Sequence, residues 1–318
     1  AGTLGAAGGN NFSFDKSTSN TLTLLAAATY TGTTTVRGSQ LTLRDAAVIS
    51  GGGAVSALYG ATLALDNSGL STSTARLGTS SVNLTGSTLQ FLGAAGSDAQ
   101  TVGALTLGAG ASTVNVTLLG SSAISGSSAL LTLASLSAGS QSTINFSYSG
   151  GTMGFARSGV AGALGTSQSA NSQVLITSAP TVTNGIIGPW AVVNSSVATT
   201  STTTTANPFG TYSSNLLTTP PAATDNITTG SAALGTWGTV TMNTLAIRST
   251  SATASMALTG KSLDGLMTLV SGGLLTSYNG QTTAIRGTRI TAGIAANATF
   301  YDYANGSAGQ SIQAQISD

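Results

Sequence analysis

The chain has 318 residues, of which 41% are hydrophobic and only 5% are charged, and its mean hydropathy is +0.29. Nine basic and eight acidic residues leave a formal charge of +1, which excludes the basic surface that nucleic-acid binding needs. The sequence has no His, Cys or Glu, which excludes a disulfide framework and removes most side chains used in metal binding and acid–base catalysis.

Short alternating runs of apolar residues and Thr, bounded by Gly, Ser and Asn, recur along the chain and predict β-strands. The clearest runs are residues 21–24, 40–43, 61–65 and 104–107. Helix signals are poor, because Gly or Thr interrupts nearly every window in which a 3.6-residue period could build. The sequence therefore predicts an all-β protein.

The runs repeat at a spacing typical of solenoids. One leucine from each run gives steps of 19, 22, 26, 16 and 26 residues, for Leu22, Leu41, Leu63, Leu89, Leu105 and Leu131. A period of about 22 residues suits one turn of a parallel β-helix, or β-solenoid, whose alternate side chains fill a narrow core. A β-sandwich of turn-separated strands is the alternative. We expect Leu22, Leu41, Leu63, Leu105 and Val36 to point inward and be buried.

A Thr- and Pro-rich stretch interrupts this pattern. Residues 198–206 read ATTSTTTTA and are followed by Pro208, Pro220 and Pro221, which cannot donate to a strand ladder. We therefore expect three parts: a first solenoid part at 1–183, an irregular junction with a loop excursion at 184–240, and a second solenoid part at 241–318. Trp190 and Trp237 are expected to cover the junction.

Residues 20–66 resemble the autotransporter-associated β-strand repeat of large bacterial surface proteins. The matching text is NTLTLL at 20–25, ATYTGTTTV at 28–36, GSQLTL at 38–43 and GATLAL at 60–65. The second half resembles the spacers of very long repeat proteins of planctomycete and verrucomicrobial type, through NGIIGPWA at 184–191 and IQAQISD at 312–318. The resemblance implies a parallel β-helix, an extracellular or cell-surface location and a longer parent chain.

Two further features bear on location. No run of about 18 apolar residues occurs, so we expect no membrane span. The chain begins at Ala1 without an initiator Met, and we expect a mature exported product or, as the preferred reading, a segment of a longer protein.

Candidate chemistry is sparse. Asp45 and Asp66 lie 21 residues apart, so they could stack on one face and be neutralised by Arg44 and Arg37. Two such carboxylates are the minimum for glycoside hydrolysis. Turn capping or simple solvation is the favoured explanation of these aspartates, and we predict no catalytic, cofactor-binding or metal-binding residues.

Calcium ligands are also few. The isolated oxygen donors are at Asp66–Asn67, Asp225–Asn226 and Asp302, too few for the six to eight oxygens that calcium takes.

These features favour a non-catalytic extracellular structural protein, a β-solenoid subunit of a surface fibre, filament or sheath. The expected partners are copies of itself or neighbouring repeats of a longer chain. The alternative is an adhesin or passenger-type display module that binds a surface glycan or another partner. A polysaccharide-processing β-helix enzyme is a distant alternative.

Overall fold

The computed structural model describes residues 12–94, 96–119, 128–149, 153–157, 172–178, 180, 184, 187–194, 213–214, 222–229, 239–249, 257–259, 266–278, 283–292, 300–306 and 310–317. Their regular structure is entirely β, without any helix, and every pairing between the described strands is parallel. The all-β prediction is therefore confirmed. The chain divides into two compact units, Ala1–Pro180 with Ala191–Ser196, and Thr181–Trp190 with Val197–Asp318.

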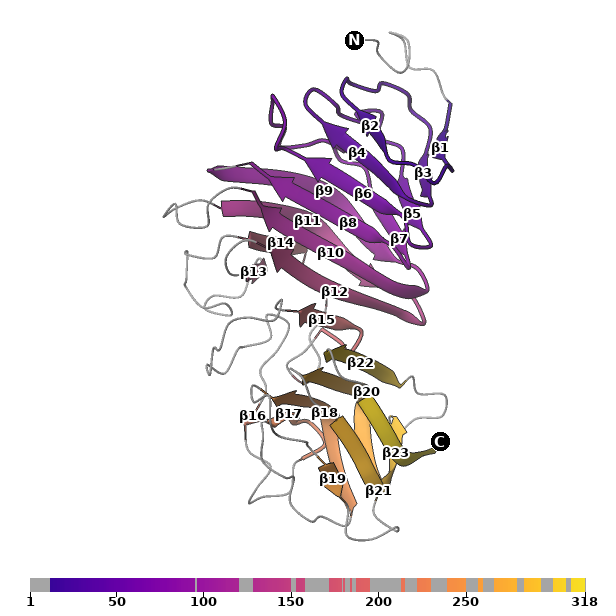
Figure 1. Ribbon diagram of the computed structural model, residues 1–318, viewed down its shortest axis with the longest axis vertical. Coiled ribbons are helices and arrows are strands. Elements are labelled where there is room, and N and C mark those ends of the chain that lie inside the picture. Colours follow the sequence, from indigo (N-terminus) through magenta and orange to yellow (C-terminus); the bar gives the residue numbers. More distant parts are fainter. Residues whose placement is uncertain are drawn as a thin grey trace. The chain divides into compact units, whose positions relative to one another are not determined.

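The first unit contains two sheets between which the chain alternates (Figure 1). The eight-stranded sheet has the order β1-β3-β5-β7-β9-β11-β14-β13, and the seven-stranded sheet has the order β15-β12-β10-β8-β6-β4-β2. The strands of the first sheet are β1 (Phe14–Lys16), β3 (Thr34–Arg37), β5 (Val55–Leu58), β7 (Val82–Thr85), β9 (Ser97–Leu107), β11 (Ser128–Ala138), β13 (Met153–Arg157) and β14 (Ser172–Ser178). Those of the second are β2 (Leu22–Leu24), β4 (Gln40–Arg44), β6 (Thr62–Asp66), β8 (Thr88–Gly93), β10 (Gly110–Leu118), β12 (Ser142–Ser149) and β15 (Ala191–Asn194).

Apolar residues occupy the same register position in successive strands and form the core. In the second sheet Leu22 pairs with Leu41, Leu41 with Leu63, Leu63 with Leu89, and Leu89 with Val114. All of these except Leu22 are fully buried. Such columns stack one strand's side chain directly on the next and remove both from water.

The core prediction is right for four residues and wrong for one. Val36, Leu41, Leu63 and Leu105 are fully buried, whereas Leu22 is 36% exposed. The reason is position: within the described part of the chain, β2 is the last strand of its sheet, so nothing described covers Leu22 on that side.

The leucine repeat also needs a correction. Leu105 does not follow Leu89 in the stack, because Leu105 lies in β9 of the other sheet and pairs with Val82. Leu131 likewise lies in β11 and pairs with Gln100. The runs in both sheets read alike in sequence, so the spacing mixed two interleaved series.

The connections differ between the two sides of the stack. Between β3 and β12, the connections from the first sheet to the second are two or three residues long. Each has a residue with positive φ within it or directly after it: Ser39, Tyr59, Gly86, Gly110 and Gln141. In the opposite direction, up to β11, they vary from three residues at 94–96 to fifteen at 67–81.

The second unit is one parallel sheet with the order β16-β17-β18-β20-β21-β19, with β22 paired to β20 and β23 to β21. Its strands are β16 (Ser213–Ser214), β17 (Asn226–Thr229), β18 (Thr239–Ser249), β19 (Ala257–Thr259), β20 (Leu266–Tyr278), β21 (Thr283–Ala292), β22 (Tyr301–Gly306) and β23 (Gln310–Ser317). Three of the described strands, β15, β16 and β17, fall within 184–240, the range expected to be irregular. The Thr run at 198–206 and the prolines that follow it, Pro208, Pro220 and Pro221, lie outside the described residues.

A bulge marks the long β18–β20 pairing of this unit. The register shifts between Met242 and Thr244, at the buried Asn243. Three residues form hydrogen bonds with Asn243. The Asp225 carbonyl accepts from the Asn243 N–H at 2.8 Å, Ser271 Oγ donates to the Asn243 carbonyl at 2.8 Å, and Asn184 Nδ2 donates to Asn243 Oδ1 at 3.3 Å. The bulge is thus a hydrogen-bonded feature of the sheet.

Candidate functional site

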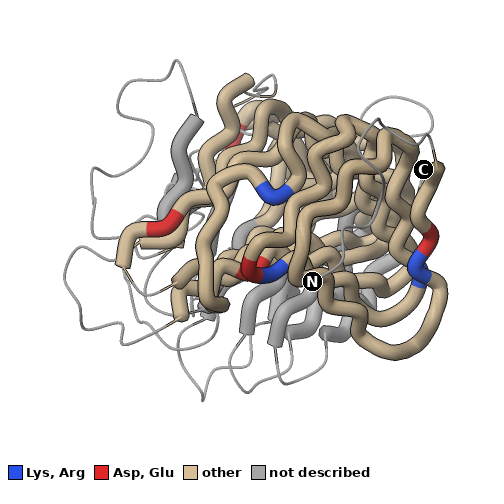
Figure 2. Tube along the Cα trace, turned by 90° about the horizontal axis from the view of Figure 1, so that it is seen from above, with Lys and Arg blue, Asp and Glu red and all other residues tan. Residues whose placement is uncertain are grey.

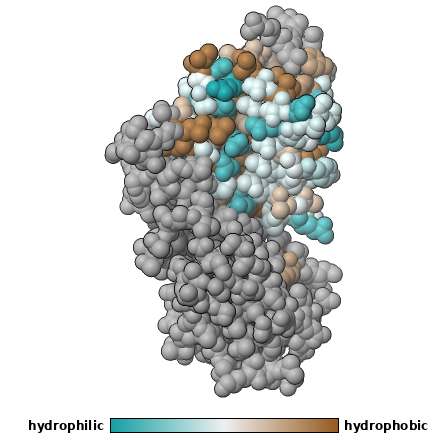
Figure 3. All heavy atoms as spheres, in the orientation of Figure 1, coloured by the Kyte–Doolittle hydropathy of each residue, from teal (hydrophilic) through white to brown (hydrophobic). Residues whose placement is uncertain are grey.

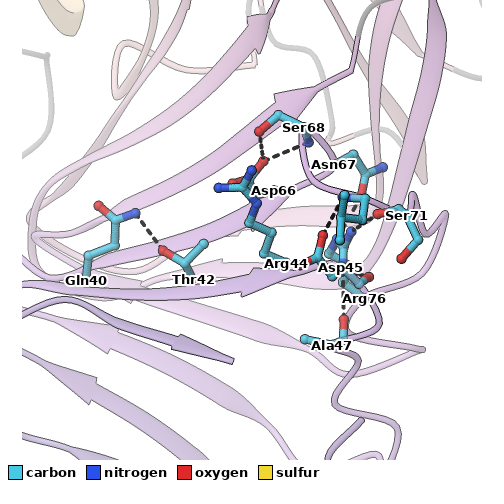
Figure 4. Close-up of polar contacts among 11 residues, drawn as sticks. Gln40, Thr42, Arg44, Asp45, Ala47, Asp66, Asn67, Ser68, Ser71 and Arg76 are labelled. Carbon is cyan, nitrogen blue, oxygen red and sulfur yellow. Dashed lines mark hydrogen bonds and ion pairs between the residues drawn. The ribbon is translucent and has the colours of Figure 1, made fainter. Parts of the chain in front are cut away.

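The densest polar cluster in the described chain lies at the carboxyl end of β6 and in the fifteen-residue connection that follows it (Figure 4). Asp66 and Asn67 end the strand and are 6% and 0% exposed. Polar groups that are buried to this extent destabilise the fold unless they are hydrogen-bonded, so each hydrogen-bond partner in the cluster contributes to stability.

Arg76 is the centre of the cluster and the largest fully buried side chain in the described structure. Its Nε donates to Asn67 Oδ1 at 2.7 Å, and its Nη1 donates to the carbonyls of Asp45 and Ala47, both at 2.9 Å. Its Nη2 donates to the Ser71 carbonyl at 3.2 Å. The planar guanidinium fork therefore joins the turn after β4 to the connection after β6.

The side-chain amide of Asn67 both donates and accepts hydrogen bonds. Its Oδ1 also accepts from the Ser73 N–H at 3.2 Å, and its Nδ2 donates to the Ser73 carbonyl at 3.0 Å and to Asp98 Oδ1 at 2.8 Å. Asp98 Oδ2 accepts from the Ala94 N–H at 2.9 Å. The network thus extends to the start of β9.

The two aspartates singled out from the sequence have different tasks. Asp66 Oδ1 accepts from Ser68 N–H at 2.8 Å and Ser68 Oγ at 2.6 Å, and its Oδ2 lies 3.7 Å from Arg44 Nε. Asp45 is in the turn after β4 with φ of +54°, and its Oδ1 accepts from the Leu70 N–H. A side chain at Gly69 would collide with this group, because an added Cβ would lie 2.0 Å from Asp45 Oδ1.

Asp45 and Asp66 do not stack on one face: the register partner of Asp66 is Arg44, and Asp45 lies beyond the end of the strand. Of the two arginines considered as partners, Arg44 faces Asp66. Arg37 instead forms an exposed ion pair with Asp15 at 3.1 Å, from the neighbouring strand β1. The charged positions of the described chain are few, as Figure 2 shows.

The electrostatics of the cluster suit a fixed cation rather than a reacting group. Burial lowers the pKa of Arg76, and the charges of Asp66, Asp98 and Asp45 oppose that change. An arginine remains protonated even after such a shift. The cluster therefore holds a permanent positive charge among three carboxylates, and the polar atoms around it accept or donate within the fold.

A second buried charge lies in β1. Lys16 is 3% exposed, and its Nζ donates to the carbonyls of Thr18 at 2.5 Å and Gly38 at 3.0 Å. Arg76 and Lys16 were not singled out from the sequence, and Asn67 was considered only as an oxygen donor for calcium. The one available signal was scarcity, because each charge in so neutral a chain is a candidate for a specific task.

The oxygen donors considered for calcium are engaged elsewhere or lie outside the described side chains. Asn67 Oδ1 faces the Arg76 guanidinium, and Asp225 Oδ2 accepts from the Ala222 N–H at 2.8 Å. Among the described residues no three His, Cys, Asp or Glu side chains group together as metal ligands. The side chains of Asn226 and Asp302 lie outside the described set, as does Trp237, whereas Trp190 is half-buried.

Searches of family models, curated proteins and solved structures gave no match to the chain. The resemblance to the autotransporter-associated repeat therefore stays a prediction. Within the described residues, no helix has the length and apolar character needed to cross a bilayer.

Proposed function

We propose that the chain is a non-catalytic structural protein of the cell surface or extracellular space, and that its first unit is a parallel β-helix serving as a subunit of a fibre, filament or sheath. The observation that supports this most is the alternation of the chain between two all-parallel sheets whose apolar residues stack in register from strand to strand. That arrangement extends by repetition, as a structural element requires.

The use of charge supports the same function. Arg76 and Lys16 are buried and bonded mainly to backbone carbonyls, and Asp15 and Asp66 face arginines of neighbouring strands. In the described part of the first unit, charged groups thus hold the fold together. On the face that Figure 3 shows, the described residues form small hydrophilic and small hydrophobic areas, separated by residues of intermediate hydropathy.

The test is electron microscopy of the purified chain together with surface labelling of the cells that produce it. A structural subunit gives rods or fibres of constant width, and an antibody against the chain labels intact cells. Globular particles that stay dispersed at every concentration, or labelling only after lysis, contradict the proposal.

A glycan-binding display module is the second candidate, favoured by the outward side chains of the sheets. Amides and hydroxyls of adjacent strands bond to one another there: Asn83 Nδ2 to Ser56 Oγ at 3.4 Å, and Asn115 Nδ2 to Ser147 Oγ at 2.8 Å. Such a neutral row of donors and acceptors suits sugar hydroxyls. Binding to a panel of neutral oligosaccharides, weakened by Asn115→Ala, would support this function over a purely structural one.

A further inference from the structure

Strand β2 and the residue after it expose apolar side chains. Leu22, in β2, is 36% exposed, although its register partners along the sheet, Leu41, Leu63 and Leu89, are fully buried. Leu25, directly after β2, is 53% exposed. Within the described residues, the apolar column of the core therefore ends at this edge. No strand of the described chain pairs with the outer side of β2.

The edge also lacks the usual protection against pairing. Natural edge strands are blocked by exposed lysines, prolines or bulges. The sequence of β2 is Leu-Thr-Leu, with none of these features. In the adjacent edge strand β1, Lys16 is buried and Asp15 is neutralised by Arg37, so neither supplies an unpaired exposed charge.

We propose that this β2 edge is a self-association surface, where β2 of a second copy pairs antiparallel with it across a two-fold axis. The proposal deepens the proposed structural function and rests on its self-assembly. The carrying observation is the pattern of the strand: Leu22 and Leu24 lie on either side of Thr23, whose side chain is exposed.

A two-fold axis beside Thr23 places the leucines of both copies on the core side and the threonines of both copies on the outer side. Leu22 of one copy then faces Leu24 of the other on the core side, and the two Thr23 residues face each other on the outer side. An isologous contact of this kind closes on itself, so it yields a dimer rather than an endless polymer. In the dimer, β2 of each copy is paired on both sides, so the apolar column of one copy continues into that of the other.

The chain contains no Cys, so one introduced thiol reports the contact directly. Directly opposite residues in an antiparallel pair have Cα atoms about 4.5–5.5 Å apart, within the range of a disulfide. The full chain carrying Thr23→Cys is oxidised at micromolar concentration and run on a non-reducing gel. Leu70→Cys is the matched control, because Leu70 is 98% exposed and lies in the connection after β6, outside strand β2.

We expect Thr23→Cys to give a covalent dimer at least about tenfold faster than Leu70→Cys. In sedimentation velocity, Leu22→Lys should raise the dimer dissociation constant by about tenfold or more, and Leu70→Lys should leave it unchanged. Unfolding curves of the same variants verify that each is folded.

Equal cross-linking rates of the two variants, or a monomer at all concentrations, overturn the proposal. Assembly that proceeds unchanged in Leu22→Lys also overturns it, since the copies would then join elsewhere. In that last case the structural function survives, so the two failures are distinguishable.

Discussion

At the scale of single residues, the buried Arg76 is a structural cation that links two backbone segments, the turn after β4 and the connection after β6. Its guanidinium donates to the carbonyls of Asp45, Ala47 and Ser71 and to the side chain of Asn67. Without it, those carbonyls would be buried near unbalanced negative charge. The side chains of Asp45, Asp66 and Asn67 also hold this connection, because they accept from the N–H groups of Leu70, Ser68 and Ser73.

We therefore expect Arg76→Met to lower the free energy of unfolding by about 3 kcal/mol or more, because it leaves buried acceptors unsatisfied. Arg76→Lys should recover part of this loss, since an ammonium restores the charge but not the planar fork. The control is Arg37→Met, which removes an ion pair with side chains 52% and 51% exposed and should cost about 1 kcal/mol or less. Urea unfolding measures all three; equal losses in Arg37→Met and Arg76→Met would contradict the structural role.

Because Tyr30 is buried, we expect the folded protein to lose stability in alkaline solution. The Tyr30 ring is fully buried, and burial raises the pKa of its phenol despite a hydrogen bond of 2.6 Å to Thr34 Oγ1. Folding therefore favours the protonated phenol. This contribution is complete below about pH 10 and is lost as the pH rises through the higher folded-state pKa.

Tyr30→Phe should be less stable at neutral pH by about 1 kcal/mol, through loss of the Thr34 contact. It should also lose less stability than the natural chain above about pH 10. Urea unfolding at pH 8 to 11 tests both points. Parallel pH curves for the two proteins would show that Tyr30 does not contribute.

At the scale of elements, the short turns from the first sheet to the second depend on left-handed backbone. Gly86 has φ of +54°, and a Cβ added there meets no atom within 4 Å. Any cost of a side chain at this site is therefore conformational. We expect Gly86→Ala to destabilise by about 1 kcal/mol or more and Gly86→Asn by less, because Asn tolerates this region better. Thermal unfolding that ranks Asn below Ala would refute the explanation.

The stacked columns predict a difference between matched leucines. Leu63→Ala removes a fully buried side chain and should cost about 2–5 kcal/mol. Leu22→Ala removes a side chain in the same column that is 36% exposed, and should cost less than half of that. Urea unfolding of the two variants measures both losses in the free energy of unfolding. Equal losses would mean that Leu22 is covered in solution, as the proposed dimer would also produce at high concentration, so the comparison belongs at low concentration.

The strands were largely predictable and their arrangement was not. The expected runs at 40–43 and 61–65 fall almost entirely within β4 and β6, because alternation of Leu with Thr or Ala is a local signal. Which sheet a run joins is not local: Leu89 and Leu105 both lie in short runs of alternating apolar residues, but in different sheets. The Arg76 cluster was missed for the same reason, since it joins segments about 30 residues apart that have no motif in common.

At the scale of the whole molecule, the strands of the first unit lengthen from β1–β4 to β9–β12. They have three to five residues from β1 to β4 and eight to eleven from β9 to β12 (Figure 1). Each strand contacts mainly its two neighbours in the sheet, so local stability should follow the number of paired residues at each step.

We therefore expect amide hydrogen exchange to be slowest in β9 to β12 and progressively faster toward β1 and β2. Native-state exchange followed by mass spectrometry measures this directly. Leu63→Ala should accelerate exchange in β2 and β4 more than in β12, because its neighbours in the stack are β4 and β8. Uniform protection across the unit would instead indicate that it opens as one cooperative body.

The unequal connections on the two sides of the stack bear on how such a chain can change in length. Left-handed residues and two- or three-residue turns hold one side to a fixed geometry, while the opposite side already accommodates connections of three to fifteen residues. Doubling a flexible loop costs only about 0.6 kcal/mol of closure entropy. A foreign peptide inserted after Leu70 should thus be carried without disturbing the sheets, whereas the same peptide inserted after Gly86 should unfold them. The fold separates a side that sets the spacing of the strands from a side on which new sequence can be displayed.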